Sequence, residues 1–324
     1  MRVLVTGGAG YIGSVICSRL QSHGHEVWVY DDLSRGHRAA VPNGAPLVQG
    51  DIRDGRRLGA AIAEHGCDAV IHMAALTEVA ESVAEPELYA DVNVAGTETV
   101  IRACRSAGVP RLVFSSSAAV YGEPAGMPIV EEAPLAPTNP YGESKLAGEH
   151  ALAAAAEDGG LAFAALRYFN ACGADSERGE DHEPESHLIP LALRAVREGQ
   201  HLKVYGGDYP TPDGTCVRDY VHVVDLAAAH VAALEGLPAV AGVYNLGTGR
   251  GDSVLRVLEA ARRATGLPLQ QRVAPRRPGD PASLVASNEL AATRLGWKPQ
   301  HTLDDAVADA WGWMCRRPAG YGDR

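Results

Sequence analysis

The stretch RVLVTGGAGYIG at residues 2–13 joins a short apolar strand directly to glycines at positions 7, 10 and 13. Such glycines permit a sharp turn, close approach of the backbone to a pyrophosphate, and tight contact between the strand and the next helix. A helix that begins here directs its unpaired N–H groups and the positive end of its dipole towards phosphates. The spacing alone also fits an ordinary tight turn, but its place between strand and helix favours a dinucleotide site that includes Gly7, Gly10, Tyr11, Ile12 and Gly13.

Outward from this stretch, short β-branched runs alternate with longer amphipathic or alanine-rich segments. The alternation predicts strands at residues 2–6, 26–30, 46–49, 69–72, 111–115 and 162–167. Helices are expected near residues 11–23, 55–65, 89–107 and 142–156. The strands are nearly continuous apolar runs, which is typical of a parallel sheet covered by helices on both faces. The sequence therefore predicts an α/β fold with a Rossmann-type doubly wound parallel sheet.

The regular alternation ends near residue 170, where the chain becomes polar, acidic and glycine-containing. We place a domain boundary there, between a nucleotide-binding domain at residues 1–170 and a smaller C-terminal substrate-binding domain at residues 171–324. Within the second domain, we expect a helix at 188–199 and a strand at 202–205. A segment near 215–250 is predicted to return to the first domain, because residues 243–246 are apolar enough to join the main sheet. The two domains are thus interleaved, and residues 316–324 are expected to form a loosely held tail.

The amino-acid composition limits the kinds of molecule that the protein is expected to bind. The 324 residues carry 29 Lys+Arg against 40 Asp+Glu, a formal net charge of −11, which argues against a broad nucleic-acid surface. No apolar stretch reaches the length that crosses a membrane, and we expect no signal peptide because residues 1–5 lead straight into an apolar strand. Its six cysteines are widely spaced and are expected to be reduced thiols, as in a cytoplasmic protein. The twelve histidines show no metal-ligand spacing, so we expect no metal site.

Carboxylates follow the second and third predicted strands. Asp31 lies 18 residues after Gly13, close to the spacing of the acid that binds the adenosine ribose, and Asp32 follows it. A carboxylate there repels a 2′-phosphate, which favours NAD over NADP, although Arg35 is near enough to neutralise such a phosphate. The Asp51-Ile52 pair ends the third strand, where Asp51 either meets the adenine or caps the next helix.

Tyr141 and Lys145 are four residues apart, which places phenol and ammonium on one helix face. An adjacent ammonium and the positive nicotinamide of an oxidised cofactor favour the phenolate, so we expect the pKa of Tyr141 to fall from about 10 towards about 7. Such a lowering needs about 4 kcal/mol of differential stabilisation. The same pair also fits a contact on the surface of a helix.

The strand before this helix ends in Ser115-Ser116-Ser117, whose hydroxyls can bond a substrate oxygen or merely their own turn. The glycine loop, the serines at the strand end and Tyr141-x-x-x-Lys145, in this order, resemble the extended short-chain dehydrogenase/reductase family. Within that family the chain is similar to the enzymes that invert C4 of UDP-hexoses. The similarity covers nearly its whole length, with the most specific segments at residues 114–122, 139–145, 166–173, 205–223, 245–249 and 276–287.

This resemblance implies an NAD-dependent isomerase. Tyr141 is implied as the base that removes the proton of the sugar 4-hydroxyl while hydride passes from C4 to NAD, giving a transient 4-keto sugar. Lys145 is implied to hold the nicotinamide ribose and Ser117 to bond the reacting hydroxyl. The resemblance also implies a homodimer, formed through the helices at 89–107 and 142–156. Further cofactor contacts are implied at Met73, Ala74, Ala75, Asn93, Ser115, Lys145 and Tyr168.

The resemblance further implies a UDP-sugar site, in which Arg218 and Arg277 are candidates for bidentate contact with the diphosphate. Each arginine could instead form a salt bridge with a neighbouring aspartate. Tyr205, matched to a residue beside the uracil, could instead be a half-buried aromatic residue of a strand. The other residues assigned to substrate contacts are Ser117, Tyr141, Asn170, His187, Leu188, Tyr205, Asp280 and Ser283. His187 stands where some members have an asparagine, a change that a backbone contact by Leu188 would survive.

Two departures from the family pattern affect the ligands. Thr77 stands where many members have a lysine that touches the cofactor, so retention of NAD is expected to be looser. Ser283 stands where a tyrosine restricts the pocket of other members, which predicts activity on the N-acetylated UDP-sugars as well. A dehydratase of the same family is disfavoured, because Ala118 and Ala119 replace the two acids it needs. A non-catalytic NAD-binding regulator would not need the serine, tyrosine and lysine together.

Overall fold

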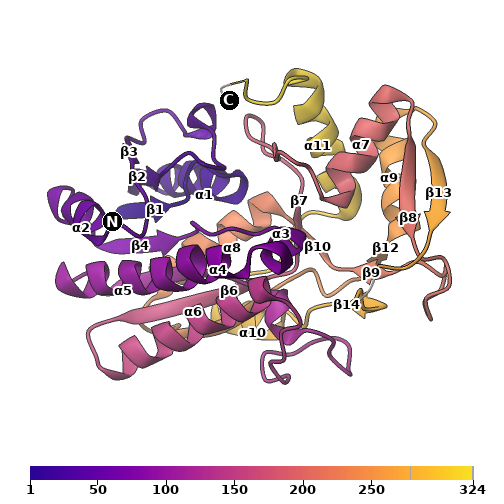
Figure 1. Ribbon diagram of the computed structural model, residues 1–324. Helices are drawn as coiled ribbons and strands as arrows, with labels where there is room; N and C mark the ends of the chain where they lie inside the picture. Colours follow the sequence, from indigo (N-terminus) through magenta and orange to yellow (C-terminus); the bar gives the residue numbers. More distant parts are fainter. Residues whose placement is uncertain (278, 323–324) are drawn as a thin grey trace.

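The computed structural model describes residues 1–277 and 279–322, and within them seven parallel strands form a central sheet (Figure 1). Val5 lies opposite Val29 of one neighbouring strand and Ile71 of the other, so the first strand is central. The α/β class and the doubly wound parallel sheet are thus confirmed. In spatial order the strands are β11 (Gly242–Leu246), β6 (Ala162–Tyr168), β5 (Arg111–Ser117), β4 (Ala69–His72), β1 (Arg2–Thr6), β2 (Glu26–Asp31) and β3 (Leu47–Gln49).

Helices cover both faces of this sheet, because alternate residues of each buried strand point to opposite sides. Val3, Val5 and Ile71 pack with α1 (Tyr11–Ser22) and α8 (Val223–Gly236) on one face. Leu4 and Val70 pack on the other face with the helices α2 (Gly55–Glu64), α5 (Gly96–Ser106) and α6 (Pro140–Glu157).

The helix predicted at 89–107 is present, but it begins earlier and contains a π-helical turn. It consists of the short α4 (Pro86–Tyr89), the turn at Ala90–Ala95 and then α5. The Asn93 side chain in this turn accepts from the Leu76 amide at 2.8 Å and donates to its carbonyl at 2.9 Å. π-Helical turns are rare in proteins, and those that occur are often found at functional sites. Here the turn brings the side-chain amide of Asn93 to the segment that follows β4.

A second core lies beside the sheet, at the right of Figure 1. It is built by α7 (Leu188–Glu198), α9 (Val254–Thr265), α11 (Leu303–Arg316) and the paired strands β8 (His201–Tyr205) and β13 (Gln270–Ala274). The chain leaves the central sheet after β6, returns for α8 and β11, and leaves again. The division into domains at residue 170 stays a prediction. Smaller elements are α3 (Val79–Ala84), α10 (Glu289–Arg294), β7 (Asn170–Cys172), β9 (Val217–Arg218), β10 (Tyr220–His222), β12 (Asp252–Ser253) and β14 (Ser283–Leu284).

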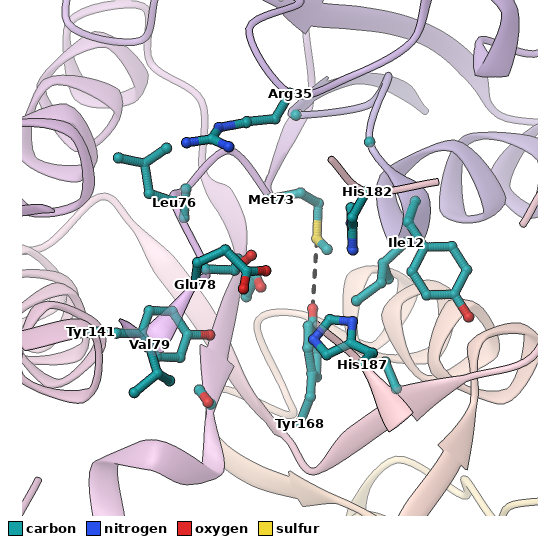
Figure 2. Close-up of a pocket in the computed structure, with 18 of the residues that line it drawn as sticks. Ile12, Arg35, Met73, Leu76, Glu78, Val79, Tyr141, Tyr168, His182 and His187 are labelled. Atoms are coloured by element: carbon teal, nitrogen blue, oxygen red, sulfur yellow. Dashed lines mark hydrogen bonds between the residues drawn. The ribbon is translucent and has the colours of Figure 1, made fainter. Parts of the chain in front are cut away.

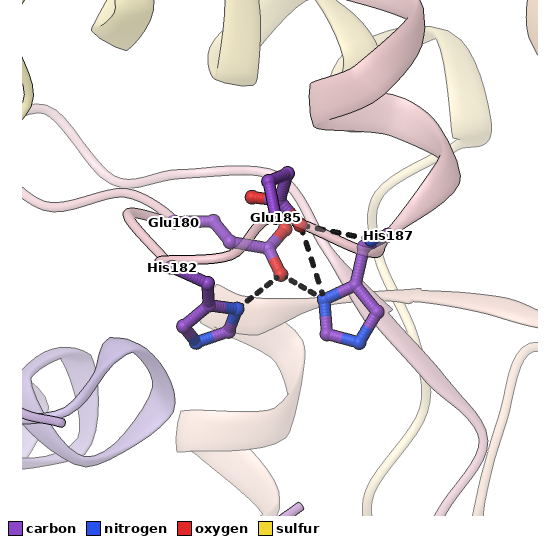
Figure 3. A group of neighbouring side chains, drawn as sticks. All are labelled: Glu180, His182, Glu185 and His187. Carbon is purple, nitrogen blue, oxygen red and sulfur yellow. Dashed lines mark hydrogen bonds and ion pairs between the residues drawn. The ribbon is translucent and has the colours of Figure 1, made fainter. Parts of the chain in front are cut away.

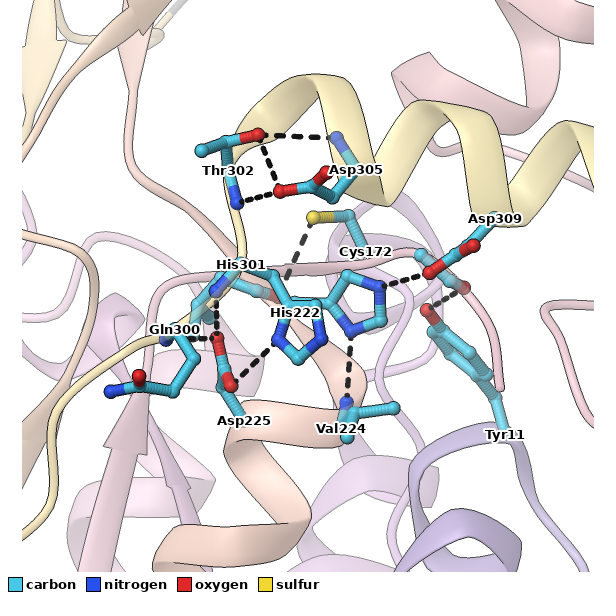
Figure 4. A network of polar contacts seen from close by, with 12 residues as sticks. Tyr11, Cys172, His222, Val224, Asp225, Gln300, His301, Thr302, Asp305 and Asp309 are labelled. Atoms are coloured by element: carbon cyan, nitrogen blue, oxygen red, sulfur yellow. Dashed lines mark hydrogen bonds and ion pairs between the residues drawn. The ribbon is translucent and has the colours of Figure 1, made fainter. Parts of the chain in front are cut away.

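A buried carboxylate joins the two parts (Figure 4). Asp225, in the first turn of α8, accepts from the backbone amides of Gln300 and His301 at 2.9 and 3.0 Å and from the His301 ring at 2.8 Å. His222 caps α8 through the Val224 amide at 3.1 Å and reaches Asp309 of α11 at 3.3 Å. These contacts fix α11 against the start of α8.

The chain after α11 is not a loose tail. Arg316 ends α11, and the buried Tyr321 packs on Trp313 and His37, with ring centroids 5.4 and 4.8 Å apart. The Tyr321 amide also donates to Asp181 at 2.8 Å. The remaining residues of the expected tail, Asp323 and Arg324, lie outside the described residues. None of the described helices combines the length and apolarity needed to cross a bilayer.

A buried histidine makes stability depend on pH. His72 of β4 lies between the Thr6 and Thr97 hydroxyls, at 2.7 and 3.0 Å, and burial lowers its pKa to about 3. Between this value and 6.5 the unfolded chain binds one more proton than the folded chain, so stability is lost as the pH falls below 6.5. His72→Gln, which cannot titrate, should flatten the slope of unfolding free energy against pH by about 1 kcal/mol per unit between pH 4 and 6.

Urea unfolding at several pH values measures this slope. His201→Gln, at an exposed position of β8, is the matched control and should keep the wild-type slope. An unchanged slope in His72→Gln would contradict the assignment.

Candidate active site

A cavity of about 760 Å³ lies at the carboxyl edge of the sheet (Figure 2). Its walls are the segments after β1, β2, β4, β5 and β6, together with residues 179–190. Most residues predicted for the site line it: Gly7, Gly10, Tyr11, Ile12, Gly13, Asp31, Asp32, Asp51, Ile52, Met73, Ala74, Ala75, Ser115, Ser117, Tyr141, Tyr168, Asn170, His187, Leu188 and Arg218. Six predicted residues lie outside the lining: Asn93, Lys145, Tyr205, Arg277, Asp280 and Ser283.

The glycine loop forms a cradle that side chains would fill. A Cβ on Gly13 would lie 2.2 Å from the Gly7 carbonyl oxygen, and one on Gly7 would lie 2.5 Å from the Ala74 amide nitrogen. Gly7 also has φ of +69°, which favours glycine. Gly10 begins α1 without a side-chain cap, so the first amides of α1 point into the cavity without a local acceptor. This cradle fits a dinucleotide pyrophosphate.

Asp31 is 7% exposed and accepts hydrogen bonds from the Ala9 and Leu33 amides, at 3.0 and 2.9 Å. Burial raises the pKa of its carboxyl group. The carboxylate therefore fixes the glycine loop as well as lining the cavity. Arg35, which could have neutralised the 2′-phosphate of NADP, forms an ion pair with Glu81.

The structure distinguishes between the two interpretations of Asp51, a contact with adenine and a helix cap. Its carboxylate pairs with the Arg53 guanidinium, at 3.0 Å from Nε, and this charge lowers the pKa of Asp51. The N-cap of α2 is instead Asp54, which accepts from the Arg57 amide at 3.0 Å. The helix-cap interpretation of Asp51 is wrong, and its carboxylate lines the cavity.

Tyr141 and Lys145 lie on one face of α6, whose start is fixed by Asn139, the acceptor for the Gly142 amide at 2.9 Å. The Lys145 amine is buried below the cavity, donates to the Ser115 carbonyl at 2.8 Å and is 5.9 Å from the centre of the Tyr141 ring. Burial lowers the pKa of Lys145 to about 7.

The expected lowering of the Tyr141 pKa is not produced by the protein alone. Burial raises the pKa of the phenol, the hydrogen bond with Ser117 lowers it, and the negative charge of Glu78 raises it. Lys145 is not among the groups that shift this pKa. A positively charged ligand beside the phenol would lower it.

Tyr168 forms the floor of the cavity beside Met73, whose sulfur lies 3.5 Å from the tyrosine hydroxyl (Figure 2). Its hydroxyl also bonds Nε2 of His230, whose Nδ1 lies 2.8 Å from the Leu226 carbonyl. Burial lowers the pKa of His230 to about 4, so this ring is neutral at pH 7 and accepts from Tyr168. The contact fixes the orientation of Tyr168.

Arg218 forms an ion pair with Asp280, the salt bridge that was the alternative to a contact with the diphosphate. The Arg277 guanidinium lies 4.1 Å from the centre of the Tyr205 ring. Ser283 is half-buried in β14 and pairs with β9, next to Leu284 of the cavity lining. The motif at 276–281 contains Pro278, which lies outside the described residues.

Several residues that line the cavity were not predicted from the sequence: Glu78, Glu180, His182 and Tyr321. Residues 173–187 were interpreted as a polar domain boundary, and Tyr321 as part of the tail. The fold gathers Glu180, His182, Glu185 and His187, a grouping that was not expected from the sequence, and the absence of a metal site stays a prediction. Their spacing, Glu-x-His-x-x-Glu-x-His, was the available signal.

Known proteins resemble the whole chain. Residues 3–247 match the NAD dependent epimerase/dehydratase family. A UDP-glucose 4-epimerase of Streptomyces lividans is 50% identical over 327 residues, which cover 100% of this chain and 99% of the relative. A Stenotrophomonas maltophila UDP-glucose-4-epimerase, solved with bound NAD and formylated UDP-arabinopyranose, is 43% identical with a TM-score of 0.95, covering 98% of this chain and 99% of the other. The Bifidobacterium longum UDP-glucose 4-epimerase, solved with NAD+ and UDP, is 40% identical with a TM-score of 0.93, covering 99% and 100%.

The matched region, the full-length relatives and the observed sheet agree with the expected extended short-chain dehydrogenase/reductase fold. The protein belongs to the NAD-dependent epimerase/dehydratase family.

Proposed function

We propose that this protein inverts the C4 hydroxyl of UDP-hexoses and so interconverts UDP-glucose and UDP-galactose. The observation that carries the proposal is that Ser117 and Tyr141 line the same cavity as the glycine cradle. Ala118 and Ala119, also in the cavity wall, carry no titratable group, which argues against the extra proton transfers of a dehydratase. The full-length likeness to UDP-glucose 4-epimerases supports the same activity.

In this mechanism, the glycine cradle, Asp31 and Asp51 hold NAD, which supplies a hydride acceptor that later returns the hydride. Tyr141 removes the proton of the 4-hydroxyl and gives it back after the sugar has turned. Ser117 donates to or accepts from the reacting oxygen, and Lys145 lies behind the phenol as a buried amine. Tyr168 and Met73 form an apolar floor that excludes water beside the reacting carbon.

Replacing the proposed base tests the mechanism. Tyr141→Phe should lower kcat for UDP-galactose by about 10³-fold, because the general base is lost while the ring still packs. Interconversion is followed by NMR of the anomeric protons, with bound NAD measured after denaturation to show that the cofactor site is intact. Tyr244→Phe, which removes a hydroxyl bonded to Val240 outside the cavity, should keep activity within a fewfold.

Mass spectrometry of the product separates the rival activity, because epimerisation conserves mass and dehydration loses one water. Full activity in Tyr141→Phe would exclude the proposed base. Folded, NAD-loaded protein that converted no UDP-hexose would overturn the proposed function.

We further propose that the N-acetylated pair, UDP-N-acetylglucosamine and UDP-N-acetylgalactosamine, is also accepted. The support is Ser283, a small half-buried side chain between the cavity-lining Pro281 and Leu284. Ser283→Tyr adds a ring at this wall and should lower kcat/KM for UDP-N-acetylgalactosamine at least tenfold, with little change for UDP-galactose. Ser283→Ala should keep both activities. Wild-type protein that turns over UDP-galactose but neither acetylated sugar would exclude this range.

We propose in addition that the protein acts as a cytoplasmic homodimer. Free cysteines, five of them buried, are typical of a reducing compartment. Val83 is exposed on α3, which packs against α6, one of the helices through which the resemblance implies dimerisation, and such an exposed apolar side chain suits a second copy of the chain. Light scattering during gel filtration should give twice the 34.0 kDa chain mass, and Val83→Glu should shift the protein towards the monomer. A monomeric wild type would contradict the dimer.

A further inference from the structure

The segment between β7 and α7 carries a group of four side chains, here termed the loop cluster: Glu180, His182, Glu185 and His187 (Figure 3). Among the described residues, one potential ligand atom of each lies within 4.8 Å of every other. Within the 15-residue segment 173–187, the four side chains fall in positions 180–187, so a short stretch of chain brings two carboxylates and two imidazoles together.

The donor atoms are turned towards one another. Oε1 of Glu180 lies 3.3 Å from Nδ1 of His182 and in direct contact with Nδ1 of His187. Oε1 of Glu185 is 3.9 Å from the same His187 nitrogen. Within the part of the chain that the structure describes, neither glutamate forms an ion pair with an arginine or lysine.

Both histidines direct a nitrogen at the same acid. Nδ1 of His182 is a buried atom that lies 3.3 Å from Oε1 of Glu180. Nδ1 of His187 contacts the same oxygen, so the two imidazoles and this carboxylate converge on one point.

The surroundings hold the carboxylates in place and leave an entrance. Glu185 is 1% exposed, and its Oε1 accepts from the amides of Ser186 and His187, both at 2.8 Å. Glu180 is 6% exposed, whereas His187 is 47% exposed and lines the cavity. Backbone bonds of this kind orient ligating side chains, and the cavity gives an ion a path to them.

From this geometry we propose that the loop cluster binds one divalent transition-metal ion of the zinc class. Two imidazole nitrogens and two carboxylate oxygens suit Zn²⁺, Co²⁺ and Ni²⁺, whereas Mg²⁺ and Ca²⁺ prefer oxygen alone. A bound ion cross-links residues 180–187 at the wall of the substrate cavity. The proposal goes beyond C4 epimerisation, since none of these four residues has a role in moving the proton or the hydride.

The test uses the full-length, NAD-loaded protein after chelator treatment and removal of the chelator. Co²⁺ titration is followed by visible absorption, which reports the ligand field of the ion, and Zn²⁺ binding is measured by calorimetry. We expect one equivalent of Co²⁺ to bind and Zn²⁺ to displace it. Absence of stoichiometric binding of either ion would overturn the proposal, whatever the epimerase activity proves to be.

Variants locate the site. His187→Ala and Glu180→Gln should each weaken Co²⁺ and Zn²⁺ binding by at least about 100-fold, because each removes a direct ligand. Two control variants should bind Co²⁺ and Zn²⁺ as the wild type does. They are Glu183→Gln, in the same segment but outside the loop cluster, and His201→Ala, at an exposed position of β8. His187 is exposed, so His187→Ala should keep the fold, which circular dichroism checks. This variant therefore carries the test even if Glu180→Gln proves unstable. Unchanged binding in His187→Ala would place the ion elsewhere and overturn the assignment.

Discussion

Parallel hydrogen bonding in the central sheet brings the carboxyl ends of β1, β2, β4, β5 and β6 to one edge. In a doubly wound sheet this edge is where ligands bind, because the loops that leave the strands diverge there and open a crevice. The glycine cradle, Asp31, Met73, Ser117 and Tyr168 therefore meet although they are spread over more than 160 residues. The direction of the strands is the constraint from which the geometry of the cavity follows.

A buried ion pair fixes the helix that carries Tyr141 and Lys145. Arg167 of β6 binds Glu149 of α6 through two bonds, of 2.9 and 2.6 Å, and Ser116 of β5 also donates to this carboxylate. Glu149 lies one turn beyond Lys145, so these contacts set the rotation of α6 against the sheet. Loss of one partner would leave an uncompensated buried charge, which costs several kcal/mol.

The cavity wall formed by residues 179–187 is supported by chain segments far from it in sequence. The Ser186 hydroxyl donates to Glu78 at 2.7 Å, which joins residues 179–187 to the segment after β4. The Tyr321 hydroxyl meets the Gly179 backbone, with the amide at 3.2 Å, so the end of the chain supports the same loop. Substrate cavity and loop cluster thus share a support that involves three separate regions of the chain.

The sequence by itself determined the order and type of most elements, the glycine cradle and the Tyr141–Lys145 spacing, because these follow from periodicity and from contacts between near neighbours. Tertiary structure alone decided the π-turn at Asn93, the pairing of Arg218 with Asp280 and the burial of Tyr321. It also decided that burial raises the pKa of the Tyr141 phenol, against the local expectation. Burial and long-range pairing depend on which distant segments meet, and no local pattern encodes that.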